Sequence, residues 1–120
     1  MRAEMELVHR DRRGDIYRIS VDDREMILLH TKRGYARGGD FHESVQHDVV
    51  IRGSVKFTLH MDDGDHSTEI EEGEAISFPA GVPHMFTSLE DSLVLEWLEG
   101  EFEKTYYPPY RKIVEERMES

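Results

Sequence analysis

Two histidines and one carboxylate occur at spacings from which a β-sheet protein can assemble a metal site. Asp40 and His42 are two residues apart, so on a strand both side chains point to the same face. His84 follows the segment Pro79-Ala80-Gly81, whose proline and glycine predict a rigid turn. Two imidazoles and one carboxylate with open coordination positions are typical of non-haem Fe(II) centres, and the same donors suit Mn, Co, Ni or Zn. These three residues are therefore candidate metal ligands and candidate catalytic groups.

The fourth donor is either Gln46 or His47, because the strand that carries them has two possible registers. In one register Gln46 and Asp48 face inward, and Gln46 adds a neutral amide oxygen. In the other, His47 faces inward together with Val49 and Ile51, and it adds a third imidazole. The His47 face is the more apolar of the two, which favours its burial. Both alternatives stay open on local pattern alone.

Arg37 is a candidate for binding an anionic group of a ligand. It precedes Gly38 and Gly39, close to the candidate metal ligands, and a guanidinium pairs well with a carboxylate or a phosphate. The alternative is a surface arginine paired with one of the 26 acidic residues. The two glycines are expected to serve backbone geometry rather than binding.

The elements that must position these residues are mostly short strands. Runs of β-branched and aromatic residues alternate with polar ones and end at Gly, Asp or Pro, which predicts an all-β sandwich or barrel. The chain end differs, because Pro108-Pro109 followed by residues 110–117 predicts a short C-terminal helix. The predicted strands are residues 15–21, 25–30, 46–51, 54–60, 66–70, 75–78 and 93–98.

Length and composition exclude several functional classes. A chain of 120 residues is the size of one domain, so we expect residues 1–120 to form a single domain. The net charge of −11 disfavours nucleic acid as a partner, and no apolar run is long enough to span a membrane. The chain has no cysteine, which excludes disulfide and thiolate chemistry. The N-terminal residues lack an apolar leader, and we expect a cytoplasmic protein.

The segment 34–53 resembles the first motif of the cupin superfamily. That motif runs glycine, five residues, His-X-His, three or four residues, glutamate, six residues, glycine. Gly34, His42 and Gly53 match it at every step of the spacing, with Asp40 at the first histidine and Gln46 at the glutamate. The family spacing thus favours Gln46 as the inward residue over His47.

The segment 73–88 resembles the second cupin motif, which runs glycine, five residues, Pro-X-Gly, two residues, histidine, three residues, asparagine. Gly73, Pro79, Gly81 and His84 match it without a gap, and Ser88 stands at the asparagine. The 19 residues between Gly53 and Gly73 have the length of one hairpin. The resemblance implies a double-stranded β-helix, the cupin jelly roll, with the site inside the mouth of the barrel.

The resemblance to cupins implies three classes of function. The first is a protein that binds a divalent metal, a small polar ligand or both, and that acts as a metal-dependent dioxygenase or isomerase. Its metal ligands are Asp40, His42, His84 and either Gln46 or His47, and its metal is Fe, Mn, Ni, Co or Zn. We expect a homodimer with a small-molecule ligand.

The second class is a metal-independent nucleotide-sugar ketoisomerase or epimerase of the RmlC-like branch. Residues 11–14 resemble the Asp-X-Arg-Gly opening of those enzymes, and residues 37–42 resemble their Arg-Gly-X-His-X-His run, with Asp40 at the first histidine. In that class the inward histidines do acid–base work on a keto-sugar. The third class is a non-catalytic binding module, for which the substituted ligand set is the main support. The fold alone does not choose among the three classes.

Overall fold

The strands of the computed structural model, which describes residues 2–118, form two antiparallel sheets. The six-stranded sheet has the order β1-β2-β3-β10-β5-β8, and the five-stranded sheet has the order β11-β4-β9-β6-β7. The elements are β1 (Ala3–Asp11), β2 (Gly14–Val21), β3 (Arg24–Thr31), β4 (Ala36–Phe41), β5 (Gln46–Arg52), β6 (Ser54–Met61), β7 (Gly64–Glu71), β8 (Ala75–Phe78), β9 (His84–Ser88), β10 (Ser92–Leu98), β11 (Thr105–Tyr106) and α1 (Pro108–Met118).

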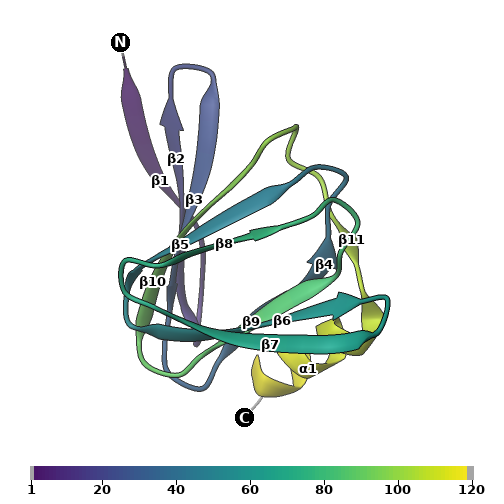
Figure 1. Ribbon diagram of the computed structural model, residues 1–120. Helices are drawn as coiled ribbons and strands as arrows, with labels where there is room; N and C mark the ends of the chain where they lie inside the picture. The colour runs from purple at the N-terminus through teal and green to yellow at the C-terminus, as the bar shows by residue number, and fades with distance from the viewer. Residues whose placement is uncertain (1, 119–120) are drawn as a thin grey trace.

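The two sheets close into a jelly-roll barrel, which confirms the predicted fold class (Figure 1). The strands β1, β2 and β3 extend beyond the barrel at one side, and α1 lies against the opposite end. Every strand predicted from the alternation is present. The predicted strands do not include β9, nor β1, which is largely polar, β4, which contains two glycines, and β11, which has two residues. Two of them, β4 and β9, carry the candidate site.

The inward side chains of both sheets form one apolar core at the bottom of the barrel. Phe57 on β6 packs against Phe78 and Phe86, with ring centroids 5.6 and 5.4 Å apart. Leu29 and Val94 come from the facing sheet and are also buried. This core fills one part of the barrel, so the polar residues farther along β4, β5 and β9 line the space that remains.

The C-terminal helix begins at Pro108, where a proline loses no hydrogen bond, and it covers the outer side of β4 and β9. Tyr110 and Val114 are buried against Ala36 and Met85. The Tyr110 hydroxyl also donates to a carboxylate oxygen of Asp65 at 2.5 Å. The helix is therefore fixed to both ends of the five-stranded sheet and stabilises the strand that carries Asp40.

The outer face of the six-stranded sheet is apolar, which is unusual for an antiparallel sheet that faces solvent on one side. The strand register places five apolar side chains in one row across it: Leu7, Tyr17, Leu28, Leu95 and Val49. Leu7 is 42% exposed, and the other four are half-buried.

Within residues 2–118, no helix has the length and apolar character that crossing a membrane requires.

Candidate metal centre and ligand pocket

The two strands missed from the sequence bring the three strongest candidate ligands together. Asp40 lies near the end of β4, and His84 is the first residue of β9, directly paired with it. A β-bulge between Gly38 and Asp40 shifts the register at this point. His42 follows β4 immediately, so all three side chains enter the barrel at its mouth.

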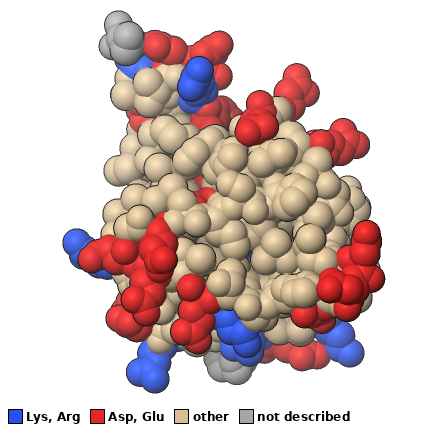
Figure 2. Space-filling model, in the orientation of Figure 1, with Lys and Arg blue, Asp and Glu red and all other residues tan. Residues whose placement is uncertain are grey.

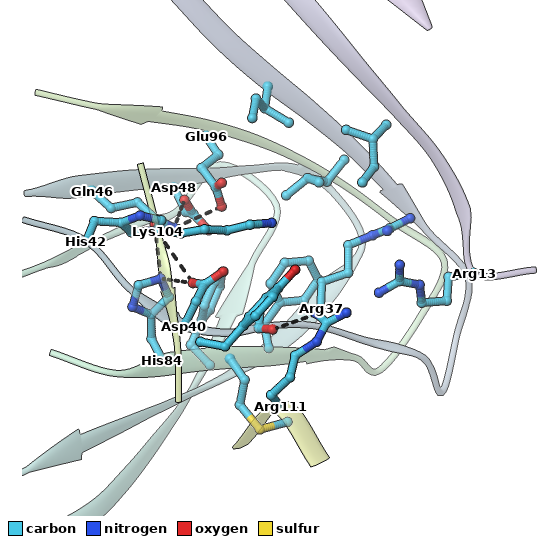
Figure 3. Close-up of a pocket in the computed structure, with 18 of the residues that line it drawn as sticks. Arg13, Arg37, Asp40, His42, Gln46, Asp48, His84, Glu96, Lys104 and Arg111 are labelled. Atoms are coloured by element: carbon cyan, nitrogen blue, oxygen red, sulfur yellow. Dashed lines mark hydrogen bonds and ion pairs between the residues drawn. The ribbon is translucent and has the colours of Figure 1, made fainter. Parts of the chain in front are cut away.

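These three side chains form a compact group of metal-ligating atoms (Figure 3). The Asp40 Oδ1 atom lies 3.5 Å from Nε2 of His42 and 3.5 Å from Nε2 of His84. One ligand atom from each residue lies within 4.8 Å of the other two. All three residues are buried, with exposed fractions of 8% or less. Among the described residues, this is the one such group of His, Asp or Glu that could hold a metal ion.

Backbone carbonyls fix the tautomer of both histidines. The Nδ1 atom of His42 lies 2.6 Å from the Glu103 carbonyl oxygen, and Nδ1 of His84 lies 2.9 Å from that of Val82. A carbonyl only accepts, so Nδ1 carries the proton in each ring. In the neutral ring the Nε2 lone pair then faces Asp40. Burial lowers the pKa of His84, which favours this neutral form.

Gln46 is the inward residue of β5, and it adds a fourth acceptor to the group. It is 2% exposed, and its Oε1 atom lies 3.0 Å from Nε2 of His84. Its amide nitrogen donates to Oδ1 of Asp48 at 2.9 Å and to Oε1 of Glu96 at 2.8 Å, which sets the orientation of the amide. Phe78 stacks on the His84 ring at 4.4 Å between centroids and holds it in place.

The structure does not place His47 in the site, which corrects the alternative with His47 inward. Its ring contacts Oγ of Ser77 at 2.7 Å and Oε1 of Glu99 at 2.9 Å, and it packs against Trp97 on the outer face. The apolar pattern was misleading because both faces of this sheet are covered with apolar residues. The apolar character of Val49 and Ile51 was therefore no guide to which face lines the barrel.

Asp48, which is buried, and Glu96, which is half-buried, form a carboxyl pair behind Gln46. Asp48 is 1% exposed, and its Oδ2 atom has no hydrogen-bond partner among the described residues. Burial raises the pKa of Asp48 to about 7. Burial and the neighbouring Asp48 raise the pKa of Glu96 well above its usual range. The pair therefore retains a proton at neutral pH, as is typical of two carboxyl groups that share a site.

The buried Asp48 should make the protein less stable as the pH rises. Its pKa is higher in the folded than in the unfolded chain, so the folded state binds more protons between about pH 4 and pH 7, and the free energy of unfolding falls across that window. We expect Asp48→Asn to reduce this fall, by on the order of 3 kcal/mol at most. Urea unfolding at pH 5 and pH 8 measures the change in the free energy of unfolding between the two pH values. Asp23→Asn, at an exposed aspartate, is the control. Equal pH dependence in wild type and Asp48→Asn would contradict the assignment.

A pocket of about 440 Å³ opens from these residues toward the extended side of the barrel. The candidate ligands line one end, and Arg37, Arg13, Lys104 and Arg111 also line it. In Figure 3, Arg37 lies between Asp40 and Arg13, and Lys104 extends across the pocket. The volume is within the range of small-molecule sites.

Residues 11–14 have a structural role at the turn between β1 and β2. Asp11 holds the Arg13 guanidinium, with Nη2 at 2.8 Å and Nε at 3.1 Å from Oδ2. Burial alone would raise the pKa of Asp11, but the hydrogen bonds from Arg13 and His9 together lower it. The Arg13 Nη1 atom donates to the Ala36 carbonyl at 3.2 Å. Gly14 packs against the His30 backbone, where a Cβ atom would clash. The Asp-X-Arg-Gly pattern thus has a complete explanation in local packing.

The structure brings five of the site residues predicted from the sequence to one pocket: Asp40, His42, Gln46, His84 and Arg37. The Asp48–Glu96 pair and Lys104 also line this pocket and were not predicted. Asp48 was detectable, because it shares a strand face with Gln46. Lys104 had no signal in the sequence, because it lies in an irregular segment that reaches the pocket only through the pairing of β11 with β4.

No protein-family model and no curated protein matches the chain. Solved structures do match it. A mutant of oxalate decarboxylase from Bacillus subtilis superposes with a TM-score of 0.76 over 90% of this chain, at 18% sequence identity. CapF in complex with an inhibitor superposes with a TM-score of 0.71 over 88% of this chain, also at 18% identity. The chain spans about a third of each of these proteins, 31% and 34% respectively.

A further structure of the Bacillus subtilis decarboxylase, described as having Mn(II) centres, superposes with a TM-score of 0.68 at 22% identity. It covers 84% of this chain, which spans 28% of the decarboxylase. At these identities the likeness establishes the fold and not the activity. The fold is the cupin jelly roll, as the two sequence motifs implied, and the chain carries a candidate Asp/His/His metal site within it.

Proposed function

The chain has the cupin fold, and on that premise we propose that it binds one divalent transition metal and uses it to act on a small oxygen-rich substrate. Asp40, His42 and His84 are the metal ligands, and the Gln46 amide oxygen is the fourth donor. The reaction is an oxygenase-like or isomerase-like step at a substrate bound in the 440 Å³ pocket. The metal is Fe, Mn, Co, Ni or Zn, since all of these accept imidazole and carboxylate ligands.

One observation supports the metal site most strongly: four nitrogen and oxygen atoms lie close together, and with both imidazoles neutral all four are acceptors. Both histidines donate from Nδ1 to backbone carbonyls, so their Nε2 lone pairs are directed at Oδ1 of Asp40. The Gln46 oxygen lies 3.0 Å from Nε2 of His84. Such contacts between acceptors are unfavourable unless a proton or a metal cation lies among them. Hydrogen bonds from Nδ1 to carbonyls are also the usual support for metal-bound histidines.

The donor set fits a catalytic rather than a purely structural metal. Three protein ligands and one weak amide leave open positions for substrate, and a metal there supplies Lewis acidity toward a substrate oxygen. The residues of the chain do the rest of the work. Phe78 and the two carbonyls hold the imidazoles in place, and the Asp48–Glu96 pair keeps a proton within the pocket wall.

Elemental analysis tests this proposal. Tag-free protein is expressed with mixed trace metals, dialysed without chelator and analysed by plasma mass spectrometry. We expect about one equivalent of a transition metal per chain in the wild type and less than a tenth of that in His42→Ala. The matched control is Lys32→Ala, an exposed substitution outside the pocket, which should retain the metal.

Little metal in wild-type protein after replete expression would contradict the proposal. The alternatives would then be a metal-independent nucleotide-sugar isomerase, in which His42 and His84 act as acid and base, or a non-catalytic binding module. Binding and turnover of nucleotide sugars in the presence of chelator would distinguish between these two.

We also propose that the protein is a homodimer. The apolar row on the outer face of the six-stranded sheet supports this, because a second copy would cover the same row in a two-fold arrangement. Light scattering of the intact protein gives its mass in solution, and a monomer would contradict the proposal.

A further inference from the structure

Arg37 is a buried cation with no ion-pair partner among residues 2–118. It is 3% exposed. Its Nε atom donates to Oγ1 of Thr31 at 2.7 Å, and its Nη2 atom donates to the His30 carbonyl at 2.9 Å. Its Nη1 atom is buried and has no hydrogen-bond partner. A buried charge without a paired anion is costly, so this arrangement requires an explanation beyond packing.

The free end of the Arg37 side chain belongs to the ligand pocket. Arg37 lines the same cavity as Asp40, His42 and His84, and in Figure 3 it lies between Asp40 and Arg13. Thr31 and the His30 carbonyl hold the guanidinium from one side, which leaves both hydrogens of Nη1 and one hydrogen of Nη2 for another partner. Two parallel N–H groups of this kind match the two oxygens of a carboxylate.

Of the other three Lys and Arg side chains that line the pocket, two have carboxylate partners. Arg13 is neutralised by Asp11, and Arg111 pairs with Glu115 at 3.1 Å. Lys104 lies over the Tyr106 ring at 5.1 Å and, in the part of the chain that the structure describes, has no carboxylate within ion-pair distance. A chain with a net charge of −11, whose acidic side chains are drawn red in Figure 2, thus keeps two cations of one pocket without carboxylate partners. This contrast points to an anionic ligand.

We propose that the pocket takes a small carboxylic acid, whose carboxylate binds Arg37 while a second oxygen of the same molecule faces the metal site. This rests on the proposed function, since the metal is the second anchor. Lys104 contributes long-range attraction from the pocket rim, because its side chain is exposed. The cavity of about 440 Å³ limits the ligand to a small acid rather than a polymer.

Isothermal titration with acetate, malonate and pyruvate tests this proposal, using manganese-loaded and chelator-treated protein. We expect at least one acid to bind the loaded protein with a dissociation constant below about 1 mM. Arg37→Lys keeps the charge but loses the paired N–H groups and should weaken binding about tenfold. Lys104→Met should weaken it about threefold, and because Lys104 is exposed this variant should fold normally. Arg52→Gln is the matched control, an exposed arginine outside the pocket, and should change nothing.

The outcomes separate the two proposals. Weaker binding that still depends on Arg37 in chelator-treated protein supports the carboxylate site even if the metal assignment fails. Metal uptake with no binding of any of the three acids, or with binding that neither Arg37→Lys nor Lys104→Met reduces, overturns the carboxylate site and leaves the metal site standing. Inorganic phosphate is titrated in parallel. Tighter binding of phosphate than of all three acids, lost in Arg37→Lys, would overturn the carboxylate assignment in favour of a phosphorylated ligand.

Discussion

Replacing His84 by alanine is expected to weaken binding of a divalent transition metal at least a hundredfold. His84 is one of only two imidazoles in the group, and its Nε2 atom faces both Oδ1 of Asp40 and Oε1 of Gln46. Loss of a partner that merely orients a ligand costs 10- to 100-fold in affinity, so loss of the ligand itself should cost more. Competition titration of chelator-treated protein with Co²⁺ or Zn²⁺ measures the effect.

His66→Ala is the matched control for this experiment. His66 is exposed on β7, contacts Asp63 at 2.7 Å and lies outside the pocket, so its loss should change metal affinity less than twofold. A His84→Ala protein that is folded by circular dichroism and binds the metal as tightly as the wild type would show that the metal lies elsewhere. An equal loss in both histidine variants would indicate surface binding.

Gly39→Ala should cause the largest loss of stability of any small substitution near the site. Gly39 has a φ of +80°, and a Cβ atom there would lie 2.6 Å from Cα and 2.7 Å from the backbone nitrogen of Arg111. Backbone atoms of a packed helix cannot yield as a flexible side chain can. The substitution must displace α1 from β4, and we expect a loss of at least about 3 kcal/mol in the free energy of unfolding, measured in urea.

Gly34→Ala separates this clash from backbone strain. Gly34 has a φ of +87°, close to that of Gly39, but nothing lies within 4 Å of the position of its Cβ atom. The Gly34→Ala variant should therefore lose only about 1 to 2 kcal/mol in the free energy of unfolding, which is the cost of the left-handed conformation. Equal losses in the two variants would mean that the contact between β4 and α1 does not constrain the fold as described.

Much of the fold was predictable because its signals are local. The alternation along residues 15–21, 46–51 and 54–60 predicts strands from side-chain period alone, and β6 and β7 form the one hairpin expected between Gly53 and Gly73. The strands that were missed are defined by their partners instead. The β4 strand contains Gly38 and Gly39, which have little strand propensity, and its conformation depends on pairing with β9 and packing against α1.

Some features of the candidate site could likewise be predicted from the sequence, and others could not. The spacing of Asp40, His42 and His84 within the two motifs is sufficient to group these three residues from the sequence alone. The choice between Gln46 and His47 was not predictable from apolar pattern, because the outer face of the six-stranded sheet is apolar as well. The unpaired state of Arg37 also could not be predicted, because it depends on which acidic side chains lie near it in space.

The most direct test of the metal site is anomalous diffraction from crystals of manganese-loaded protein, with data collected on both sides of the manganese absorption edge. We expect one strong peak within coordination distance of Nε2 of His42, Nε2 of His84 and Oδ1 of Asp40. The peak should be lost in His84→Ala crystals. A full-occupancy peak at surface carboxylates, with none among these three residues, would contradict the proposed metal site.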